Sequence, residues 1–381
     1  LERENNWVFT RCGSRVNPVF SGTKMAWLRR ERPDIYKKAY KLLAVPDYLL
    51  WLLTGRLATD HTYGSRSLLM NLRTRQWDRD LLALFGVGEE KLCPLIEPGS
   101  VCGVLAKAAA ARTGLSQGLP VVTAGGDQQC GAIGQGVVKA GAVSITAGTG
   151  GYLIAGAEKI PESLRDDVLC NCASIPGQYI LESSVLTCCS AFDWFRREFY
   201  GPDATPAQLD KEAEESPAGA GGCICLPYFQ GRSTPDWNTA ATALFQNVTL
   251  STRRQDMLRA LLEGIALELA RGVEVMDSYA PIGEITINGG LTNSGPFNQM
   301  LSDACGLPLL RRGRADATAR GALLVAACAL GAYGSVGEAY AAVSRNDLVQ
   351  AYTPRKENRE AYRLLREQSD RLYRLLWPSV Q

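Results

Sequence analysis

The sequence is poor in the residue that most hydrolytic and metal-dependent enzymes use. Its 381 residues include a single histidine, His61. Catalytic zinc sites usually bind the metal through histidine, and nucleophilic triads need a base that is most often histidine. One histidine therefore excludes most zinc enzymes and leaves any triad with a single candidate base. A mechanism that depends on a lone carboxylate and bound phosphates is compatible with this composition.

Long apolar segments and an excess of one charge are also missing. No apolar run reaches the roughly 20 residues that a membrane-spanning helix needs. The 41 basic and 39 acidic residues give a net charge of +2. This balance gives no reason to expect nucleic acid or an anionic membrane as the main partner. The first residues carry no signal-peptide pattern. We expect a cytoplasmic protein whose partner is a small molecule, with neither nucleic acid nor membrane involved.

Cysteine is present, but not in the spacing of a metal site. None of the twelve cysteines forms the two-residue spacing of a zinc knuckle. Several lie inside apolar strand or helix patterns, among them Cys130, Cys225 and Cys328. We therefore expect buried free thiols in a reducing compartment, and no metal site made of protein side chains alone.

The stretch from Val121 to Tyr152 organises the chain. It predicts a strand, a Gly-Gly-Asp turn that presents Asp127, a helix of small residues, and a second strand. The second strand ends in Gly148-Thr149-Gly150-Gly151, and backbone amides at such a turn can bind an anion. A carboxylate can orient an alcohol and accept its proton while amides hold a phosphate. The pattern therefore favours phosphoryl transfer to an alcohol, provided that the two turns face each other.

Two motifs in this stretch resemble those of a known family. Gly126-Asp127-Gln128-Gln129, followed by Ala147-Gly148-Thr149-Gly150, is similar to the FGGY carbohydrate kinases, which include glycerol kinase and xylulokinase. The resemblance implies a two-domain α/β fold of the ribonuclease H-like type, shared with actin and the Hsp70 ATPase. It implies ATP and Mg²⁺ as cofactors and Asp127 as the general base. It also implies that Thr149 and the amides of Gly148 and Gly150 contact the transferred phosphate.

The resemblance also implies a division of the chain. Residues 1–141 would be the remainder of the N-terminal, substrate-side domain, and residues 142–381 the C-terminal, nucleotide-side domain. A length of 381 residues is in any case more than one hydrophobic core usually supports, so two domains are expected.

A second glycine turn follows the strand predicted at 284–288 and precedes a helix predicted at 295–306. From the spacing alone this could be a nucleotide contact or a generic strand–helix turn. However, the segment GGLTNSGPFNQMLSDACGLPL resembles the family's adenine-side motif over its whole length. The resemblance implies that Gly289, Gly290 and Asn293 flank the nucleoside. Cys189 stands where the family usually has glycine and could crowd the phosphates.

Three features bear on the acceptor. Asn17-Pro18-Val19-Phe20-Ser21-Gly22-Thr23-Lys24 resembles a segment in which glycerol kinases carry a tyrosine that touches glycerol, so Val19 argues against glycerol. Gln128 is typical of glycerol kinases, whereas the loop from Arg232 to Trp237 resembles that of pentulose kinases. We expect Gln128 and Arg232 to contact a ketose or polyol, with xylulose favoured. Arg232 could equally be only a cation in a surface loop.

An alternative function stays open. We expect the alignable region to begin near Asn17 and the family's opening segment, with its phosphate hairpin, to be missing, so that the first domain is incomplete. The alternative is therefore a truncated, catalytically weak or inactive relative that binds nucleotide or a partner. Oligomeric state is also open, with a homodimer as one option.

Three predicted helices carry further expectations. The helix from Pro46 to Gly55 has a stripe of aromatic residues and leucines that we expect in the core. In the helix Arg253–Met276, three glutamates alternate with core-side leucine and isoleucine, namely Glu263, Glu268 and Glu274. The helix Ala317–Leu330 is rich in small residues, which let a helix approach a neighbour closely.

Overall fold

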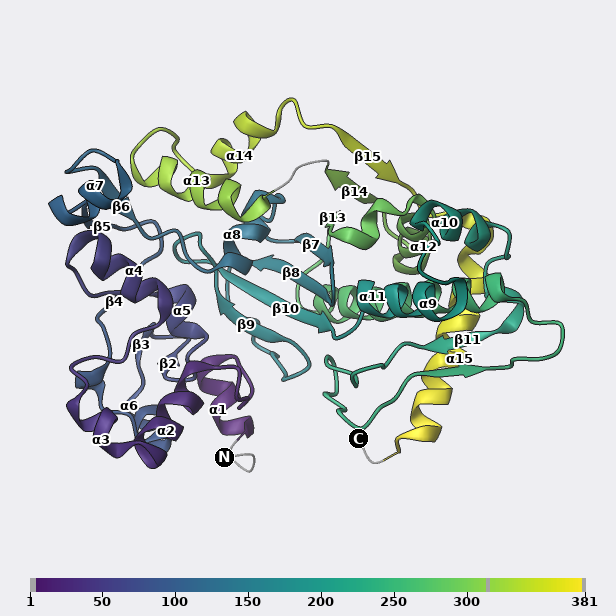
Figure 1. Cartoon of the computed structure of the whole chain (residues 1–381), viewed down its shortest axis with the longest axis horizontal. Helices are drawn as coiled ribbons and strands as arrows, with labels where there is room; N and C mark the ends of the chain where they lie inside the picture. The colour runs from purple at the N-terminus through teal and green to yellow at the C-terminus, as the bar shows by residue number, and fades with distance from the viewer. Residues whose placement is uncertain (1–4, 313–315, 379–381) are drawn as a thin grey trace. The chain divides into compact units, whose positions relative to one another are not determined.

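A computed structural model of the chain describes residues 5–312 and 316–378. The chain divides into two compact units, each made of three segments (Figure 1). Unit 1 comprises Leu1–Ala140, Gly156–Leu181 and Ala315–Asn346, and unit 2 comprises Gly141–Ala155, Glu182–Arg314 and Asp347–Gln381. The first change of unit falls next to the predicted boundary at residue 141. The chain then returns to unit 1 twice, so the predicted single boundary at residue 141 does not describe the whole division.

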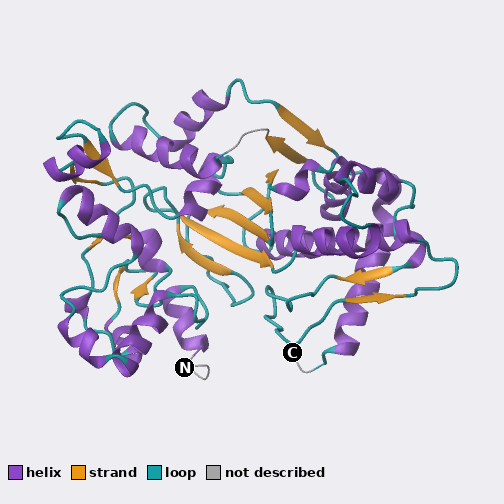
Figure 2. Cartoon of the chain, in the orientation of Figure 1, coloured by secondary structure: helices purple, strands orange, loops and turns teal. Residues whose placement is uncertain are grey.

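Unit 1 consists mainly of helices, with short strands that pair in twos (Figure 2). Strands β1 and β4 are parallel, whereas β2 with β3 and β5 with β6 are antiparallel. The elements of unit 1 are α1 (Asn5–Cys12), α2 (Ser21–Glu31), α3 (Pro33–Lys38), α4 (Val45–Thr54), β1 (Thr59–Asp60), α5 (His61–Ser65), β2 (Met70–Asn71), β3 (Gln76–Trp77), α6 (Arg79–Phe85), η2 (Glu89–Lys91), β4 (Leu95–Ile96), β5 (Val101–Val104), α7 (Lys107–Thr113), β6 (Pro120–Val122), α8 (Asp127–Gly134), β9 (Leu169–Cys172), α13 (Ala317–Ala329) and α14 (Val336–Ser344).

The closest helix packing in unit 1 joins α8 to α13. A Cβ atom at Gly134 would lie 1.9 Å from the carbonyl oxygen of Ala317, and one at Gly321 would lie 1.8 Å from that of Cys130. No side chain fits at these distances, so the contact requires glycine on both helices. The close approach predicted for the small-residue helix at 317–330 is therefore confirmed. It anchors α8, the helix that begins with Asp127.

Helix α4 departs from the expectation. Its predicted span is confirmed, and Gly55 ends it with a φ of 76°. The aromatic and leucine stripe is not core, however. Asp47 and Leu50 are buried, whereas Tyr48, Leu49 and Trp51 are between 43% and 51% exposed. Apolar content alone does not show which face of a helix meets the core.

Unit 2 is built on a mixed sheet with helices packed on it (Figure 1). The strand order in this sheet is β15-β14-β13-β7-β8-β10-β9; β13 is parallel to β7 and β14, whereas β8 and β15 run antiparallel to their neighbours β7 and β14. The elements that lie in unit 2, or enter it from unit 1 or leave it, are β7 (Ala142–Ala147), β8 (Gly151–Ala157), β10 (Tyr179–Val185), α9 (Cys189–Tyr200), α10 (Pro206–Glu214), η3 (Ala220–Gly222), β11 (Ile224–Leu226), β12 (Leu244–Gln246), α11 (Arg254–Asp277), β13 (Glu284–Asn288), η4 (Gly290–Asn293), α12 (Gly295–Cys305), β14 (Leu309–Arg312), β15 (Val349–Tyr352), η5 (Lys356–Asn358) and α15 (Arg359–Leu376).

Helix α11 is buried on most of its surface, which corrects the expectation for its glutamates. Glu263 is fully buried and Glu268 is 7% exposed. Each has a cation beside it: Arg259 Nε lies 2.8 Å from Glu263, and Arg232 Nε lies 3.0 Å from Glu268. The alternation with leucine and isoleucine placed the helix correctly. It did not show that two of the three acids point inward.

Two further expectations from composition can be compared with the structure. Nine of the twelve cysteines are buried and the other three are half-buried, and all are free thiols. Within the described ranges, no helix combines the length and the apolar character that a membrane span requires.

Candidate active site

Asp127 is an exposed acid of unit 1. It is the first residue of α8, directly after the glycine turn that follows strand β6. Its Oδ1 accepts a hydrogen bond of 2.9 Å from the backbone N–H of Gln128. Asp127 is thus presented to solvent at the start of a helix, and its role as general base stays a prediction.

The turn before Asp127 is held by a residue 64 positions earlier. The backbone N–H of Gly126 donates to Thr62 Oγ1 at 2.9 Å. Thr62 Oγ1 in turn donates to Asp60 Oδ1 at 2.5 Å, and the N–H of Thr62 donates to the same oxygen at 2.9 Å. Thr62 and Asp60 are both buried, and burial raises the pKa of Asp60. Sequence reasoning missed Thr62, because it is remote from the turn in the chain.

The other side of the turn is closed by Ser174. Gly125 has a φ of 102°, and a Cβ atom there would lie 2.1 Å from Ser174 Oγ. A Cβ atom at Gly126 would lie 2.4 Å from Gln129 Oε1. Gly125 therefore requires glycine through its backbone conformation and its close neighbour, whereas the atom nearest to a Cβ at Gly126 is the end of a glutamine side chain. Gln128, the predicted substrate contact beside Asp127, is half-buried.

The glycine turn of unit 2 connects β7 to β8. Gly148 N donates to the carbonyl of Gly150 at 2.9 Å, and Thr149 is exposed. The carbonyls of Gly148 and Thr149 accept bonds of 2.8 and 2.9 Å from the N–H groups of Cys189 and Cys188 at the start of α9. In a trans peptide the next N–H points opposite to the carbonyl. The N–H groups of Thr149 and Gly150 therefore point away from α9, as an anion-binding turn requires.

The second glycine turn of unit 2 lies against the first. Gly289 has a φ of 98°, and a Cβ atom there would lie 2.5 to 2.9 Å from the backbone atoms of Ala147, the last residue of β7. A Cβ atom at Gly290 would lie 3.3 Å from the sulfur of Cys189. The structure therefore brings together five of the predicted cofactor residues, Gly148, Thr149, Gly150, Gly289 and Gly290, at the ends of two adjacent strands.

A cavity of about 430 Å³ opens beside these turns, within unit 2. Helices α9 and α10 and the turn η4 line it, with Cys189, Phe192, Pro206, Asp210, Gly290 and Asn293 among the lining residues. A pocket of this size with mostly apolar walls and a few polar groups is typical of a small-molecule site. Of the predicted residues, Gly290 and Asn293 line it directly. Cys189, at the start of α9, was expected near the phosphates and lines the cavity, whereas the walls contributed by the rest of α9 and by α10 were not predicted.

Two titratable groups of this cavity are perturbed by burial. Burial raises the pKa of Asp210, against the effect of a 2.6 Å hydrogen bond that its carboxylate accepts from Ser294 Oγ. Burial also raises the pKa of the Cys189 thiol, whose Sγ lies 3.4 Å from the carbonyl oxygen of Ala147. The thiol is therefore kept protonated. It stands between the two glycine turns, the place where crowding of phosphates was expected.

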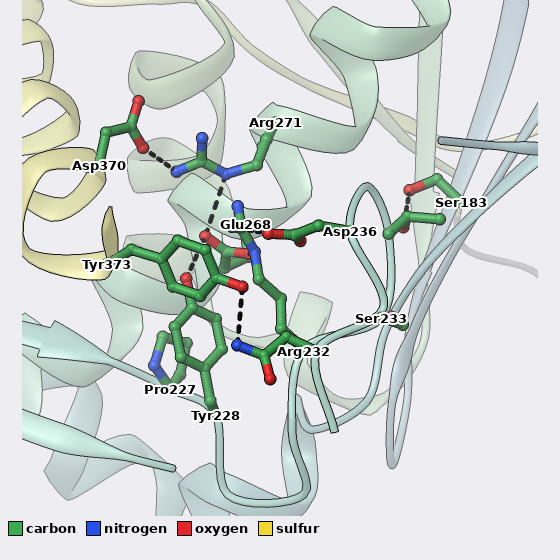
Figure 3. A network of polar contacts seen from close by, with 12 residues as sticks. Ser183, Pro227, Tyr228, Arg232, Ser233, Asp236, Glu268, Arg271, Asp370 and Tyr373 are labelled. Carbon is green, nitrogen blue, oxygen red and sulfur yellow. Dashed lines mark hydrogen bonds and ion pairs between the residues drawn. The ribbon is translucent and has the colours of Figure 1, made fainter. Parts of the chain in front are cut away.

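Arg232 lies in a different environment from the one expected. It is 6% exposed, and its Nε and Nη1 form ion pairs with Glu268 (3.0 Å) and Asp236 (3.2 Å). The guanidinium also lies 4.2 Å from the ring centre of Tyr373, and Figure 3 shows it enclosed by this cluster. The interpretation as a surface cation is therefore wrong. A substrate contact stays a prediction, but these contacts favour a structural role.

The cluster around Arg232 is a chain of alternating charges. Glu268 also pairs with Arg271 at 3.2 Å, and Arg271 pairs with Asp370 on helix α15 (Figure 3). Burial by itself would lower the pKa of Arg232, but Glu268, Tyr228 and Asp236 together outweigh it and the pKa is raised. Burial would likewise raise the pKa of Glu268, but Arg271 and Arg232 lower it. Both groups are held charged, and the cluster ties the loop at 232–238 to α11 and α15.

Comparison with protein families matches both halves of the chain. The model of the N-terminal domain of the FGGY family of carbohydrate kinases matches residues 1–134, and the model of its C-terminal domain matches residues 143–330. The match begins at the first residue, so the expectation that the alignable region starts near Asn17 is wrong.

Relatives of two substrate types are similar to the chain. A glycerol kinase of Alkalilimnicola ehrlichii is 32% identical over 91% of the chain and 69% of its own length. The xylulose kinase of Escherichia coli is 29% identical over 96% of the chain and 75% of its own length.

Solved structures show the same fold. The xylulose kinase of Rhodospirillum rubrum is 27% identical, with a TM-score of 0.91 over 99% of the chain and 76% of its own. The glycerol kinase of Plasmodium falciparum, solved with ADP, is 25% identical, with a TM-score of 0.86 over 97% of the chain and 74% of its own. The chain therefore has the two-domain α/β fold of the actin and Hsp70 ATPase type.

Proposed function

The chain belongs to the FGGY family of carbohydrate kinases, and from that premise we propose that it transfers the γ-phosphate of ATP to a hydroxyl of a ketose or polyol. The observation that carries the proposal is Asp127. It is an exposed acid at the start of α8, directly after a turn in which Gly125 requires glycine because its φ is 102°. A rigidly held acid that is open to solvent is what a general base for an incoming alcohol needs.

In this proposal Asp127 accepts the proton of the acceptor hydroxyl. Phosphoryl transfer demands little covalent chemistry from the protein, so positioning and charge stabilisation carry the catalysis. The N–H groups of Thr149 and Gly150 would hold the transferred phosphate, because the carbonyls of Gly148 and Thr149 are turned toward α9. Amides held in this way need no reorganisation as charge develops on the phosphate oxygens.

The nucleoside of ATP would occupy the 430 Å³ cavity of unit 2. Its walls offer the apolar surface of Phe192 to a base, while Gly290 lets the ligand approach the backbone closely. Asn293 is exposed at the rim of this cavity, and its Oδ1 accepts a hydrogen bond of 2.5 Å from Arg311. The amide group is thereby oriented, with its NH₂ left to serve as a donor.

Mg²⁺ fits this arrangement as a partner of the nucleotide. In the described part of the chain, no group of three or more histidine, cysteine, aspartate or glutamate side chains could hold a metal ion. Mg²⁺ in phosphoryl-transfer enzymes is bound mainly by substrate phosphates and water, with one or two carboxylates. The ion would neutralise charge on the phosphates, and Asp127 is a candidate for an indirect contact through water.

For the acceptor we propose a xylulose-like ketose. Val19 takes the place at which glycerol kinases carry a tyrosine, and it is 62% exposed at the start of α2. A valine cannot offer the hydroxyl of that tyrosine, which argues against glycerol. Relatives of both types match the chain at similar identity. Overall identity therefore does not choose between the two acceptors, and the preference for a ketose depends on individual side chains such as Val19.

The test is an ATP-dependent phosphorylation screen with D-xylulose, L-ribulose, L-fuculose, gluconate and glycerol as acceptors. Asp127→Asn should lower kcat by about 10² to 10⁴, since it removes the base but keeps the size of the side chain. Asp34→Asn is the matched control: Asp34 is also an exposed acid in the first turn of a helix, α3. It should leave kcat unchanged. Equal rates for wild type and Asp127→Asn would overturn the role of Asp127.

A further inference from the structure

We infer that Thr62 is a positioning residue: its hydroxyl holds the Gly125–Gly126 turn and thereby sets the direction of the Asp127 carboxylate. The inference rests on the proposed function of Asp127. It assigns a second residue to the reaction, one that touches neither substrate nor nucleotide. Thr62 lies on α5, a short helix 64 residues away from the turn along the chain.

The hydroxyl of Thr62 links the backbone of the turn to Asp60 through two hydrogen bonds. The N–H of Gly126 donates to Thr62 Oγ1 at 2.9 Å, and Thr62 Oγ1 donates its own hydrogen to Asp60 Oδ1 at 2.5 Å. The hydroxyl thus acts as acceptor and donor at once. Asp60 determines which way the hydroxyl hydrogen points, and a lone pair is left for Gly126. No other side chain of this size and shape except serine can make both bonds.

The turn is closely surrounded by side chains. A Cβ atom at Gly125 would lie 2.1 Å from Ser174 Oγ and 3.0 Å from Thr62 Cγ2. Thr62 is fully buried and Gly126 is buried, so water has little access to the N–H of Gly126. A buried N–H without an acceptor is costly, and the backbone would rotate to expose it.

Rotation at Gly126 would act directly on Asp127. Gly126 is the N-cap of α8 and Asp127 is the first residue of the helix, so one peptide plane joins the held N–H to the reacting residue. The body of α8 is held separately by α13, which approaches it closely at Cys130 and Gly134 and donates from Thr318 Oγ1 to the carbonyl of Asp127 at 3.4 Å. Loss of the Thr62 bond should therefore move the start of the helix and leave the rest in place. A displacement of about 1 Å of a catalytic group can cost 10²-fold in rate.

The first test does not depend on activity. Amide hydrogen exchange of Gly126 is measured in wild type, Thr62→Val and Thr62→Ser. Valine keeps the shape of threonine but has no hydroxyl, whereas serine keeps the hydroxyl. We expect exchange at Gly126 to be at least about 10-fold faster in Thr62→Val and within about 3-fold of wild type in Thr62→Ser. Unchanged protection in Thr62→Val would overturn the inference.

The second test is kinetic, with D-xylulose as the acceptor. Thr62→Val should lower kcat by about 10- to 100-fold with the KM for ATP unchanged, and Thr62→Ser should restore most of the rate. In the Asp127→Asn background, Thr62→Val should cause no further loss, because the two residues act as a unit. An equal loss in both backgrounds would show that Thr62 acts on stability alone.

The two proposals fail in different ways. If Asp127→Asn is as active as wild type, the proposed function of Asp127 is wrong whatever Thr62 does. If Asp127→Asn is inactive but Thr62→Val has normal kcat, the positioning role is wrong and the base is not. Thermal unfolding of each variant accompanies the measurements. Should Thr62→Val not fold, Thr62→Ala removes the same hydroxyl with less bulk.

Discussion

Asp127 and Arg232 are both charged residues that follow a glycine turn, and the sequence predicted a ligand contact for both. Their environments are opposite. Asp127 is exposed at the start of α8, and among the contacts described its carboxylate accepts a hydrogen bond only from the neighbouring N–H of Gln128. Arg232 is 6% exposed and is paired with Glu268 and Asp236 beneath the ring of Tyr373 (Figure 3).

The difference separates two uses of charge. A reacting group must stay free of a strong permanent partner, or its pKa and position are set by that partner. A structural charge must be paired, because a buried ion without a partner is very costly. Asp127 meets the first requirement, and Arg232 meets the second. A motif in the sequence names both residues but does not distinguish these uses.

The largest expected effect is the loss of stability when Arg232, the buried member of the pair, is replaced. Arg232→Met removes the cation between Glu268 and Asp236 and leaves buried carboxylate charge behind. We expect the free energy of unfolding to fall by about 3 to 5 kcal/mol, measured by urea denaturation. Asp127→Asn should change it by less than about 1 kcal/mol, since the side chain is at an exposed helix start.

Arg197→Met serves as the control for the loss of an arginine. Arg197 is on the surface of α9, with its side chain 62% exposed beside Glu198. Its replacement should cost less than about 0.5 kcal/mol, because exposed ion pairs contribute little. A comparable loss of stability in Arg197→Met and Arg232→Met would show that the buried cluster has no special structural role.

The next prediction concerns Asp47, a buried acid whose hydrogen-bond donors are uncharged. Asp47 is 5% exposed and accepts hydrogen bonds from Ala44 N and Thr59 Oγ1. Burial raises its pKa to about 6. A raised pKa means that the folded state favours the protonated form. Its contribution to stability is therefore present below the unfolded pKa of about 4, and it is lost as pH rises through about 6.

Asp47→Asn tests this shift, because the amide keeps an acceptor oxygen but cannot ionise. Relative to wild type, the variant should gain about 2 to 3 kcal/mol in unfolding free energy between pH 4 and pH 7.5. Asp34→Asn is the control of opposite sign. Burial would raise the pKa of Asp34, but the hydrogen bond and charge of Arg32 together with backbone hydrogen bonds outweigh it, so the pKa is lowered and its contribution is lost as pH falls. If the difference in unfolding free energy between Asp47→Asn and wild type does not vary with pH, the prediction is wrong.

The smallest expected effect concerns the unit 2 cavity. Ser294 caps α12 through a 3.1 Å bond from Phe297 N, and it donates to Asp210 inside the cavity. Ser294→Ala should cost about 1 kcal/mol of stability through the lost cap and should weaken ATP binding several-fold, measured by calorimetry. Ser335→Ala removes an equivalent cap from α14, where Glu338 N donates at 3.1 Å. It should cost similar stability and leave ATP binding unchanged; an equal loss of affinity would remove Ser294 from the site.

Much of the fold could be predicted because its signals are local. The strand at 284–288 has the predicted bounds, and α11, α12 and α13 each differ from the prediction by one residue at one or both ends. Periodicity and glycine position decide such elements, since they depend on neighbours within a few residues. The same holds for the glycine turns at 148–150 and 289–290, whose short-range geometry only small residues permit.

The sequence did not reveal which side chains are buried or which residues far apart in the chain touch each other. The order of elements, the family, the acid at 127 and the glycine turns were all determined by the sequence itself. Only the tertiary structure decided that Thr62 holds Gly126, that Glu268 and Arg232 pair inside unit 2, and that most of the stripe on α4 faces solvent. The physical reason is that hydrogen bonding and desolvation depend on which groups packing brings within about 3 Å of each other. Spacing along the chain carries no record of such encounters across 36 or 64 residues.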